Sequence, residues 1–520
     1  MTKFLKEWKY VLIFSPIIIL IFFILRLYNL TLLPIFVDEA IYVRWAQVMK
    51  AEETLRFLPL SDGKQPLFMW SVIPFFKIFS DPLFAGRFVS VFTGLGTLFG
   101  VFVLTYIIFK SKTASLFSSL FYAISPFSVF FDRMALVDSM LTMFGIWTII
   151  FGIAIAKTKR LDFAMLAGFS LGGALLTKSP ALFFTIMLPS TLVFADFSVE
   201  WRKRLFLVLQ LTALLIVSYI IGYGLYNILR LGPNFHLISS RNQDYVFPLS
   251  HLWTNPRDPF VFYFDRSFEW IRMMGPNLIL LIAGSAILLN LKNRFKEMLL
   301  LVFWFLFPIA IQSEFAKVIT ARYILFSLPY LFVIASSIFL VKNKKLLVFG
   351  GALLFIFVFQ ALKFNYYLLT DPEKANLPRS ERSGYLEEWT AGTGIKEAAD
   401  IIRVEAVKNL SKEIVAGTEG YFGTLPDGLQ IYLQGVPNVV VIGVGLNLSE
   451  VPSQLQDSVK AGNKTYLVIN SSRFKIKEPE SEGLKLIAAY PKAFRPDKQT
   501  HEYLWYGPRD YLYLFEVTGK

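Results

Sequence analysis

Long apolar runs recur along most of the chain, and they constrain its fold more than any other feature. Taking about 20 apolar residues as one crossing of a bilayer, we predict eleven membrane-spanning helices. They lie near 10–30, 85–109, 114–131, 139–156, 163–177, 180–195, 205–229, 276–291, 298–313, 321–341 and 346–369. The runs at 163–177 and 180–195 are short and could form a hairpin that does not fully cross. A mean hydropathy of +0.53 also favours a polytopic α-helical membrane protein.

Charge distinguishes the two sides of the predicted membrane domain. The N-terminus and the short links on its side hold 17 lysines and arginines, whereas the opposite short links hold 3, Arg133, Lys178 and Lys317. The positive-inside rule therefore places the N-terminus in the cytoplasm, in a multi-pass protein of the plasma membrane. The net charge is +14. Because the basic residues gather in the links on the cytoplasmic side, the topology accounts for this charge, and we expect no nucleic-acid partner. The chain has no cysteine, which excludes disulfides and thiolate metal sites.

The sequence changes character after Thr370, where charge, glycine and proline increase and no run is long enough to span. We expect residues 1–370 to form the membrane domain and 376–520 an extracytoplasmic α/β domain. Apolar runs at 413–416, 438–442 and 465–470 predict strands, and they alternate with helical patterns at 394–409, 425–433 and 451–461. This alternation predicts a partly parallel sheet, which runs at 484–490 and 511–517 would extend.

The first outer loop, 31–84, carries the most informative polar residues. Asp38 and Glu39 directly follow the first apolar run. Carboxylates beside hydrocarbon are costly, so they indicate a functional site at the membrane surface. The alternative is that Asp38 caps the following helix. Helical patterns at 40–57 and 66–79 predict two interfacial helices that frame the acidic pair.

Further polar residues fall on the same predicted side of the membrane. They are Lys64, Arg133, Asp138, Arg322 and Tyr323, with His236 and His251 in the fourth loop. Carboxylates and fixed cations at headgroup level suit chemistry on an anionic lipid. Structural roles are also open, because Arg322 could snorkel, Lys64 could be a solvated loop charge, and the histidines could be hydrogen-bonded loop residues.

Three of these motifs together resemble the GT-C superfamily of membrane glycosyltransferases. They are the Asp38-Glu39 pair after the first span, the turn Gly63-Lys-Gln-Pro66, and the loop from Arg133 to Asp138. The combination is similar to protein O-mannosyltransferases, the dolichyl-phosphate-mannose-protein mannosyltransferase family, and to the bacterial lipid A aminoarabinose transferase. The likeness covers roughly the first 370 residues, and the segment 382–395 also resembles bacterial relatives. It implies a GT-C fold and a polyprenyl-phosphate sugar as donor.

The predicted location of the acidic pair supports the same donor. Nucleotide sugars are cytoplasmic, whereas the acidic pair is predicted to lie outside, so a sugar carried across the membrane on a lipid is the expected donor. Asp38 is the candidate general base for an acceptor hydroxyl, with Glu39 beside it. Lys64, Arg133, Arg322 and Tyr323 are candidates for binding the leaving phosphate, and a divalent metal held by Glu39 or Asp138 could share this work. The sequence leaves open whether a hexose or a pentose is transferred, and whether the acceptor is a protein, a lipid or a glycan.

Two other classes of function fit a polytopic chain. A transporter or flippase would also have many spans and intramembrane polar groups, but we detect no internal repeat, and the polar residues gather at one face. A cell-surface scaffold could use the α/β domain to bind a partner. The intact acidic pair favours an enzyme over a scaffold.

Overall fold

The computed structural model describes residues 2–198 and 200–518, which form two compact units. The first unit comprises 1–28, 55–71 and 87–378, and the second comprises 29–54, 72–86 and 379–520. The first long loop, which we expected to belong wholly to the membrane domain, is divided between the two units. Two of its segments belong with the C-terminal domain and not with the membrane helices.

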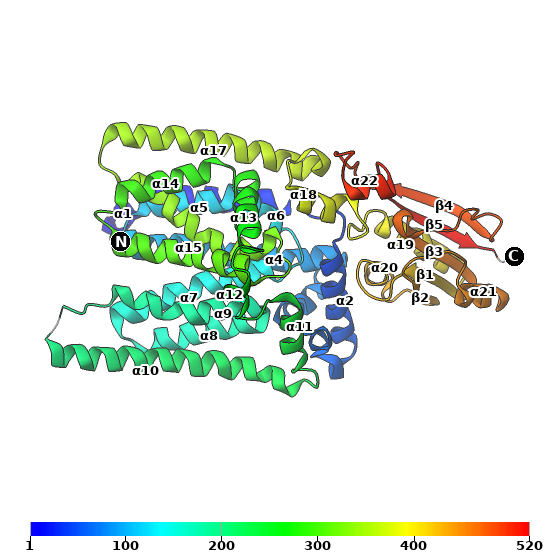
Figure 1. Ribbon diagram of the computed structural model, residues 1–520, viewed down its shortest axis with the longest axis horizontal. Helices are drawn as coiled ribbons and strands as arrows, with labels where there is room; N and C mark the ends of the chain where they lie inside the picture. Colours follow the sequence, from blue (N-terminus) through cyan, green and yellow to red (C-terminus); the bar gives the residue numbers. More distant parts are fainter. Residues whose placement is uncertain (1, 199, 519–520) are drawn as a thin grey trace. The chain divides into compact units, whose positions relative to one another are not determined.

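The first unit is a bundle of helices, many of them long enough to cross a membrane (Figure 1). Within the described residues, seven helical segments pass on length and composition, and up to nine do if each bent pair is one span. The seven are α1 (Thr2–Leu27), α4 (Pro82–Phe109), α7 (Asp138–Thr158), α10 (Trp201–Tyr226), α15 (Phe295–Phe315), η7 with α16 and η8 (Ala321–Leu340), and α17 (Lys344–Thr370). The bent pairs are α5 (Lys112–Ile124) with α6 (Pro126–Asp132), and α13 (Phe260–Met274) with α14 (Leu278–Asn290). A polytopic helical membrane fold is confirmed.

Proline accounts for both bends. Pro126 begins α6 directly after Ser125, and the two helices of that pair meet at 59°. Gly275 and Pro276 separate α13 from α14, which meet at 107°. A proline removes one backbone donor and its ring clashes with the preceding turn, so a continuous helix cannot form there.

The count of eleven spans is not confirmed, because two of the expected spans are short. They correspond to α8 (Leu161–Thr177) and to the run of η4, α9 and η5 (Ser179–Phe194). At about 1.5 Å of rise per residue, 17 residues of α8 reach about 26 Å, less than the hydrocarbon core. Helix α8 packs against both α7 and α10 (Figure 1).

Reporter fusions test the predicted sidedness, which rests on the split of 17 against 3 basic residues between alternate links. Fusions on the basic side should report cytoplasm; they follow Lys112, Arg160, Arg204, Lys296 and Lys345. Fusions after Gly63, His251 and Lys520 should report the outside. A cytoplasmic signal from the fusion after Lys520 would place both termini on the same side of the membrane. It would therefore contradict the prediction of an odd number of spans.

The second unit joins helix α2 (Val37–Ala51) and η3 (Ile73–Lys77) to a five-stranded α/β domain. The range of helix α2 overlaps residues 40–57, where the sequence predicts the first interfacial helix. The second expected helix is broken, because α3 (Leu67–Val72) passes into η3, which has a proline in its first turn.

The sheet has the order β2-β1-β3-β5-β4. Its strands are β1 (Ile414–Glu419), β2 (Val439–Gly445), β3 (Lys464–Asn470), β4 (Leu484–Pro491) and β5 (Tyr511–Val517). The first three pair in parallel, whereas β5 is antiparallel to β3 and β4. The expected partly parallel sheet is thus confirmed. Every residue of β1 is buried, as expected for a central parallel strand covered on both faces.

Helices complete this domain in the order expected from the sequence. They are α19 (Ile395–Lys408), α20 (Asp427–Leu433) and α21 (Ser453–Lys460), with the short α18 (Arg379–Arg382) and α22 (His501–Tyr506). On one face, Leu455 of α21 packs with Leu467 of β3 and Val517 of β5 in a buried apolar cluster. Gly417 of β1 lies under the same leucine, and a Cβ there would come within 2.7 Å of it. The helix can approach the sheet closely because this residue has no side chain.

Candidate functional site

The acidic pair lies in the first turn of α2. Phe36 is the N-cap residue, and the Oε2 of Glu39 accepts a hydrogen bond from the Phe36 backbone N–H at 3.0 Å. Glu39 is fully buried and Asp38 is half-buried. The alternative that Asp38 caps this helix is therefore wrong, since Asp38 is the second helical residue and the bond that closes the helix start is made by Glu39. Both acids benefit from the positive end of the helix dipole.

Both ends of α2 are fixed within the second unit. At its start, Val37 N–H donates to the Thr390 carbonyl at 3.1 Å, and Gly392 N–H donates to the Ile35 carbonyl at 2.7 Å. A Cβ on Gly392 would lie 2.4 Å from the Ile35 side chain, so glycine allows this approach. Toward its end, Gln47 Nε2 donates to the Ile431 carbonyl at 2.9 Å. The residues that hold Asp38 in place thus include part of the segment 382–395.

A cavity of about 610 Å³ opens at the other end of α2, also within the second unit. Lys50, Lys396 and Arg403 line it, together with Asp81 and Asp400. Lys396 Nζ pairs with Asp81 at 2.6 Å, and Arg403 pairs with Asp400 at 2.5 Å. Paired charges beside the aromatic rings of Phe76, Phe79 and Tyr432 suit a polar, hydroxyl-rich ligand.

In the first unit, the Gly63-Lys-Gln-Pro66 motif forms a tight turn beside α11 (Leu237–Tyr245). Gly63 has φ +63°, and a Cβ there would lie 2.6 Å from the Leu237 carbonyl oxygen. Glycine is therefore required both by the backbone conformation and by the close approach. Lys64 Nζ lies 3.4 Å from Asp62 Oδ2, and Arg241 donates to the same carboxylate at 2.5 Å. Two cations thus share one carboxylate.

A second loop lies directly against this turn. Gln65 Nε2 donates to Ser179 Oγ at 2.9 Å. The neighbouring Lys178 pairs with Asp138 Oδ1 at 2.7 Å, and its ammonium group lies 4.1 Å from the centre of the Tyr323 ring. The Tyr323 ring is thus in contact with a cation from the loop that follows α8.

The Arg322 guanidinium carbon lies 5.4 Å from the centre of the same Tyr323 ring. We call Lys64, Lys178, Arg241 and Arg322 the cation cluster. The cluster brings together Lys64, Asp138, Arg322 and Tyr323 among the expected residues. It adds Lys178, for which the only signal in the sequence is a lysine on the side where basic residues are scarce, and Arg241 from the fourth loop.

Arg133 has a different setting from the other expected phosphate ligands. Its side chain is 1% exposed, and its Nη1 donates to the carbonyls of Leu25, Arg26 and Tyr28 at 3.2, 3.0 and 2.8 Å. Burial, and then the nearby Arg87 and Arg26, lower the pKa of Arg133 to about 9. The guanidinium ties its loop to the end of α1, which is a structural role.

The residue before it belongs to a buried network that no sequence motif indicated. Asp132 accepts from Arg26 Nε and from the Tyr122 hydroxyl, both at 2.9 Å, and from Ser139 Oγ at 2.5 Å. Arg26, Tyr122, Asp132 and Ser139 are all fully buried. A buried charge needs such a complete set of partners. The network joins α1, α5 and α7 through Asp132, which directly precedes the loop that leads to Asp138.

The arrangement of possible metal ligands gives little support to a metal site. Among the described residues, no group of three or more His, Asp or Glu side chains is placed to hold a metal ion. Glu39 and Asp138 belong to different units, and each has a protein partner, the Phe36 N–H and Lys178. His251 bonds the Asp258 carbonyl at 2.7 Å within its own loop, which agrees with a structural role.

Comparison with known protein families finds one that is similar to part of the chain. Residues 63–223 match the model of the family described as dolichyl-phosphate-mannose-protein mannosyltransferase. This region includes Lys64, Asp138 and Lys178. No curated protein sequence matches the chain.

Two solved structures share the fold over most of the chain. ArnT from Cupriavidus metallidurans bound to undecaprenyl phosphate has a TM-score of 0.58 at 15% identity and covers 98% of both chains. The oligosaccharyltransferase AglB from Archaeoglobus fulgidus, in complex with an inhibitory peptide and a dolichol-phosphate, has a TM-score of 0.52 at 13% identity, over 90% of this chain and 70% of its own. The expected resemblance is confirmed: the chain has the fold of the GT-C glycosyltransferases ArnT and AglB, and over residues 63–223 it is similar to the protein mannosyltransferase family.

Proposed function

We propose that the protein transfers a sugar from a polyprenyl-phosphate-linked donor to an acceptor hydroxyl at the outer face of the membrane. The observation that carries this proposal is the cation cluster. Lys64 and Arg241 pair with Asp62, Lys178 pairs with Asp138, and Arg322 lies over the Tyr323 ring. Cations fixed in this way suit a lipid phosphate. The family match and the fold shared with two lipid-phosphate-bound proteins support the same donor.

The charge on the phosphate increases during the reaction. The donor is a phosphodiester with one negative charge, whereas the leaving polyprenyl phosphate carries about −1.5 to −2 at neutral pH. Cations that are fixed before the reaction stabilise the transition state more than the bound donor. Lys178 and Arg322 are fixed against one ring, and Lys64 is held by the Gly63 turn.

Asp38 acts as the general base in this proposal. The acceptor oxygen bonds to the anomeric carbon as the bond from that carbon to the phosphate oxygen breaks. The acceptor proton passes to Asp38, and the bonding electron pair leaves with the phosphate. One such displacement inverts the configuration at the anomeric carbon. The paired charges of the cavity at the other end of α2 suit a polar acceptor.

Cleavage of the donor separates this proposal from transport. Purified protein would receive polyprenyl-phosphate-linked hexose or pentose, with a membrane extract as the acceptor source. We expect free polyprenyl phosphate to accumulate as labelled sugar moves to the acceptor fraction. A flippase or transporter would leave the bond between the sugar and the phosphate intact, so an uncleaved donor with every sugar would contradict the proposal.

The turn that carries Lys64 provides a second prediction. Gly63→Ala places a Cβ 2.6 Å from the Leu237 carbonyl oxygen, so the turn must shift, and with it Lys64. We expect donor affinity to fall several-fold in a binding titration. Gly462→Ala is the matched control, because Gly462 has φ +84° and open space around its Cβ. That variant carries only the backbone strain of about 1–2 kcal/mol. Unchanged donor binding in Gly63→Ala would remove the turn from the donor site.

A further inference from the structure

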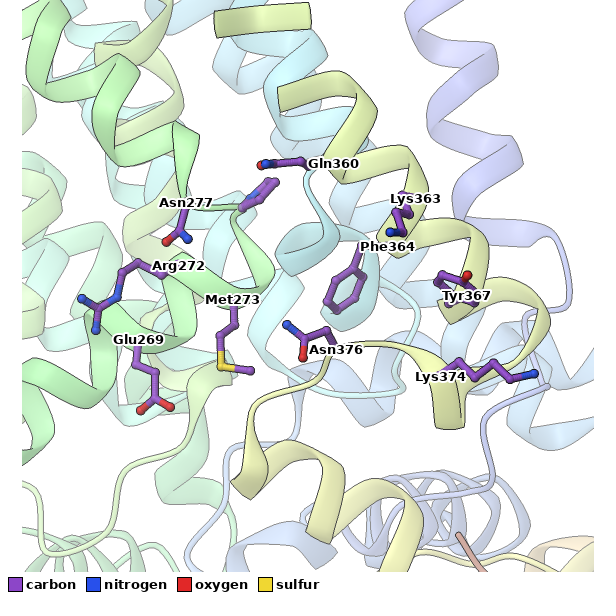
Figure 2. Close-up of a pocket in the computed structure, with 11 residues that line it drawn as sticks. Glu269, Arg272, Met273, Asn277, Gln360, Lys363, Phe364, Tyr367, Lys374 and Asn376 are labelled. Carbon is purple, nitrogen blue, oxygen red and sulfur yellow. The ribbon is translucent and has the colours of Figure 1, made fainter. Parts of the chain in front are cut away.

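A second cavity with excess positive charge lies in the first unit, apart from the cation cluster. It has a volume of about 700 Å³ and opens between α13, the start of α14, and the last turns of α17. Figure 2 shows Met273, Phe364 and Asn376 among the side chains that line this space. None of the four residues of the cation cluster lines it. We call it the α13–α17 pocket.

The charges that line this pocket do not cancel. Arg272, Lys363 and Lys374 face one carboxylate, Glu269, and Glu269 is paired with Arg266 at 2.7 Å. Lys374 is paired with Asp371 at 2.6 Å, whereas Arg272 has its nearest carboxylate, Asp265, at 3.8 Å. Within the part of the chain that the structure describes, Lys363 has neither an ion pair nor a hydrogen bond from its side chain. The pocket therefore offers an open ammonium and a weakly paired guanidinium.

The depth of Lys363 along α17 indicates what these cations would meet. Lys363 lies 19 residues after Lys344, which corresponds to about 28 Å of helix. That length is close to the thickness of the hydrocarbon core, so Lys363 reaches the headgroup level at the end opposite the basic link 342–345. Neighbouring Phe359, Leu362 and Tyr366 are 64%, 44% and 63% exposed, as expected for a helix face in contact with lipid.

The remaining lining residues divide into an apolar wall and a set of amides. Met273, Pro276, Phe364 and Tyr367 form the wall, and Asn277, Gln360 and Asn376 provide amide groups. Cations and amide donors bind phosphate oxygens, while an apolar wall fits a glycerol backbone and the first carbons of acyl chains. We propose that the α13–α17 pocket binds the phosphate headgroup of an anionic glycerophospholipid, as a lipid site separate from the proposed donor site.

Lipid titration of the full-length protein tests this inference. The protein would be held in phosphatidylcholine nanodiscs, and binding of short-chain phosphatidylglycerol would be followed by native mass spectrometry. Lys363→Gln keeps a long polar side chain and removes the charge, so we expect affinity to fall about 10-fold or more. Lys363→Arg should bind nearly as the parent does. Lys344→Gln, at the other end of the same helix, is the matched control and should change affinity little.

Three outcomes would overturn the inference. Equal losses in Lys363→Gln and Lys344→Gln would mean general attraction of anionic lipid to a basic protein. Displacement by inorganic phosphate at equal concentration would identify a site for the free anion, and stronger displacement by polyprenyl phosphate would identify a donor path. Retained binding in Lys363→Gln would remove this pocket from lipid binding. Because the readout is binding and not transfer, it stands or fails independently of the proposed function.

Discussion

Asp38→Asn is expected to lower turnover by about 10²–10⁴-fold, while binding of the polyprenyl-phosphate sugar survives. Asparagine keeps the shape of the side chain but cannot accept the acceptor proton, and general-base catalysis contributes a factor of this size. Helix α2 should remain intact, because the hydrogen bond that caps its start runs from the Phe36 N–H to the side chain of Glu39 and not to Asp38. Steady-state transfer and an independent donor-binding titration on the same preparation would measure both effects.

The control for this variant is Asp457→Asn, which makes the same chemical change at an exposed position of α21 and should leave transfer unchanged. Glu39→Gln provides a second comparison, because a glutamine oxygen can still accept the Phe36 N–H bond. A large loss in Glu39→Gln with near-normal turnover in Asp38→Asn would transfer the base role to Glu39. Near-normal turnover in both variants would remove the acidic pair from the mechanism.

The α/β domain could be predicted closely because its signals are local. The parallel strands β1, β2 and β3 consist mainly of consecutive β-branched and apolar residues, and each predicted run falls within a few residues of its strand. Buried parallel strands give such continuous runs. The division of the first loop was not predictable in the same way. The assignment of α2 to the second unit depends on bonds such as Gln47 to Ile431, 384 residues apart.

The candidate site illustrates the same limit. Arg133 belongs to a motif whose spacing suggested a phosphate ligand, but the loop folds back on α1 and its guanidinium bonds three carbonyls there. Lys178 belongs to no motif, and its importance follows from its position between Asp138 and Tyr323. Sequence spacing indicates which residues lie at the same end of a bundle. It cannot indicate which of them point inward.

Removal of the Lys178 charge is expected to weaken donor binding and to slow transfer together. Lys178→Gln alone is a poor test, because it leaves Asp138, which is 3% exposed, without its cation. A buried carboxylate left in this way costs about 3–5 kcal/mol. The double variant Lys178→Gln/Asp138→Asn removes both charges and keeps two side chains that can hydrogen-bond, so the fold should survive.

With the fold kept, the double variant measures what the Lys178–Asp138 pair contributes to donor binding. A charge-assisted hydrogen bond contributes about 1.5–3 kcal/mol, so donor affinity should fall about 10–100-fold. The rate constant should fall further than affinity does, because the leaving phosphate gains charge in the transition state. A higher KM together with a lower kcat would be the kinetic sign of a group that contacts the phosphate both in the bound donor and in the transition state. Lys460→Gln/Asp457→Asn, which makes the same two changes in an exposed ion pair of α21, is the control and should leave both constants unchanged. If the double variant transferred sugar normally with normal donor affinity, Lys178 would be a structural partner of Asp138 and the phosphate site would have to rest on Lys64 and Arg322.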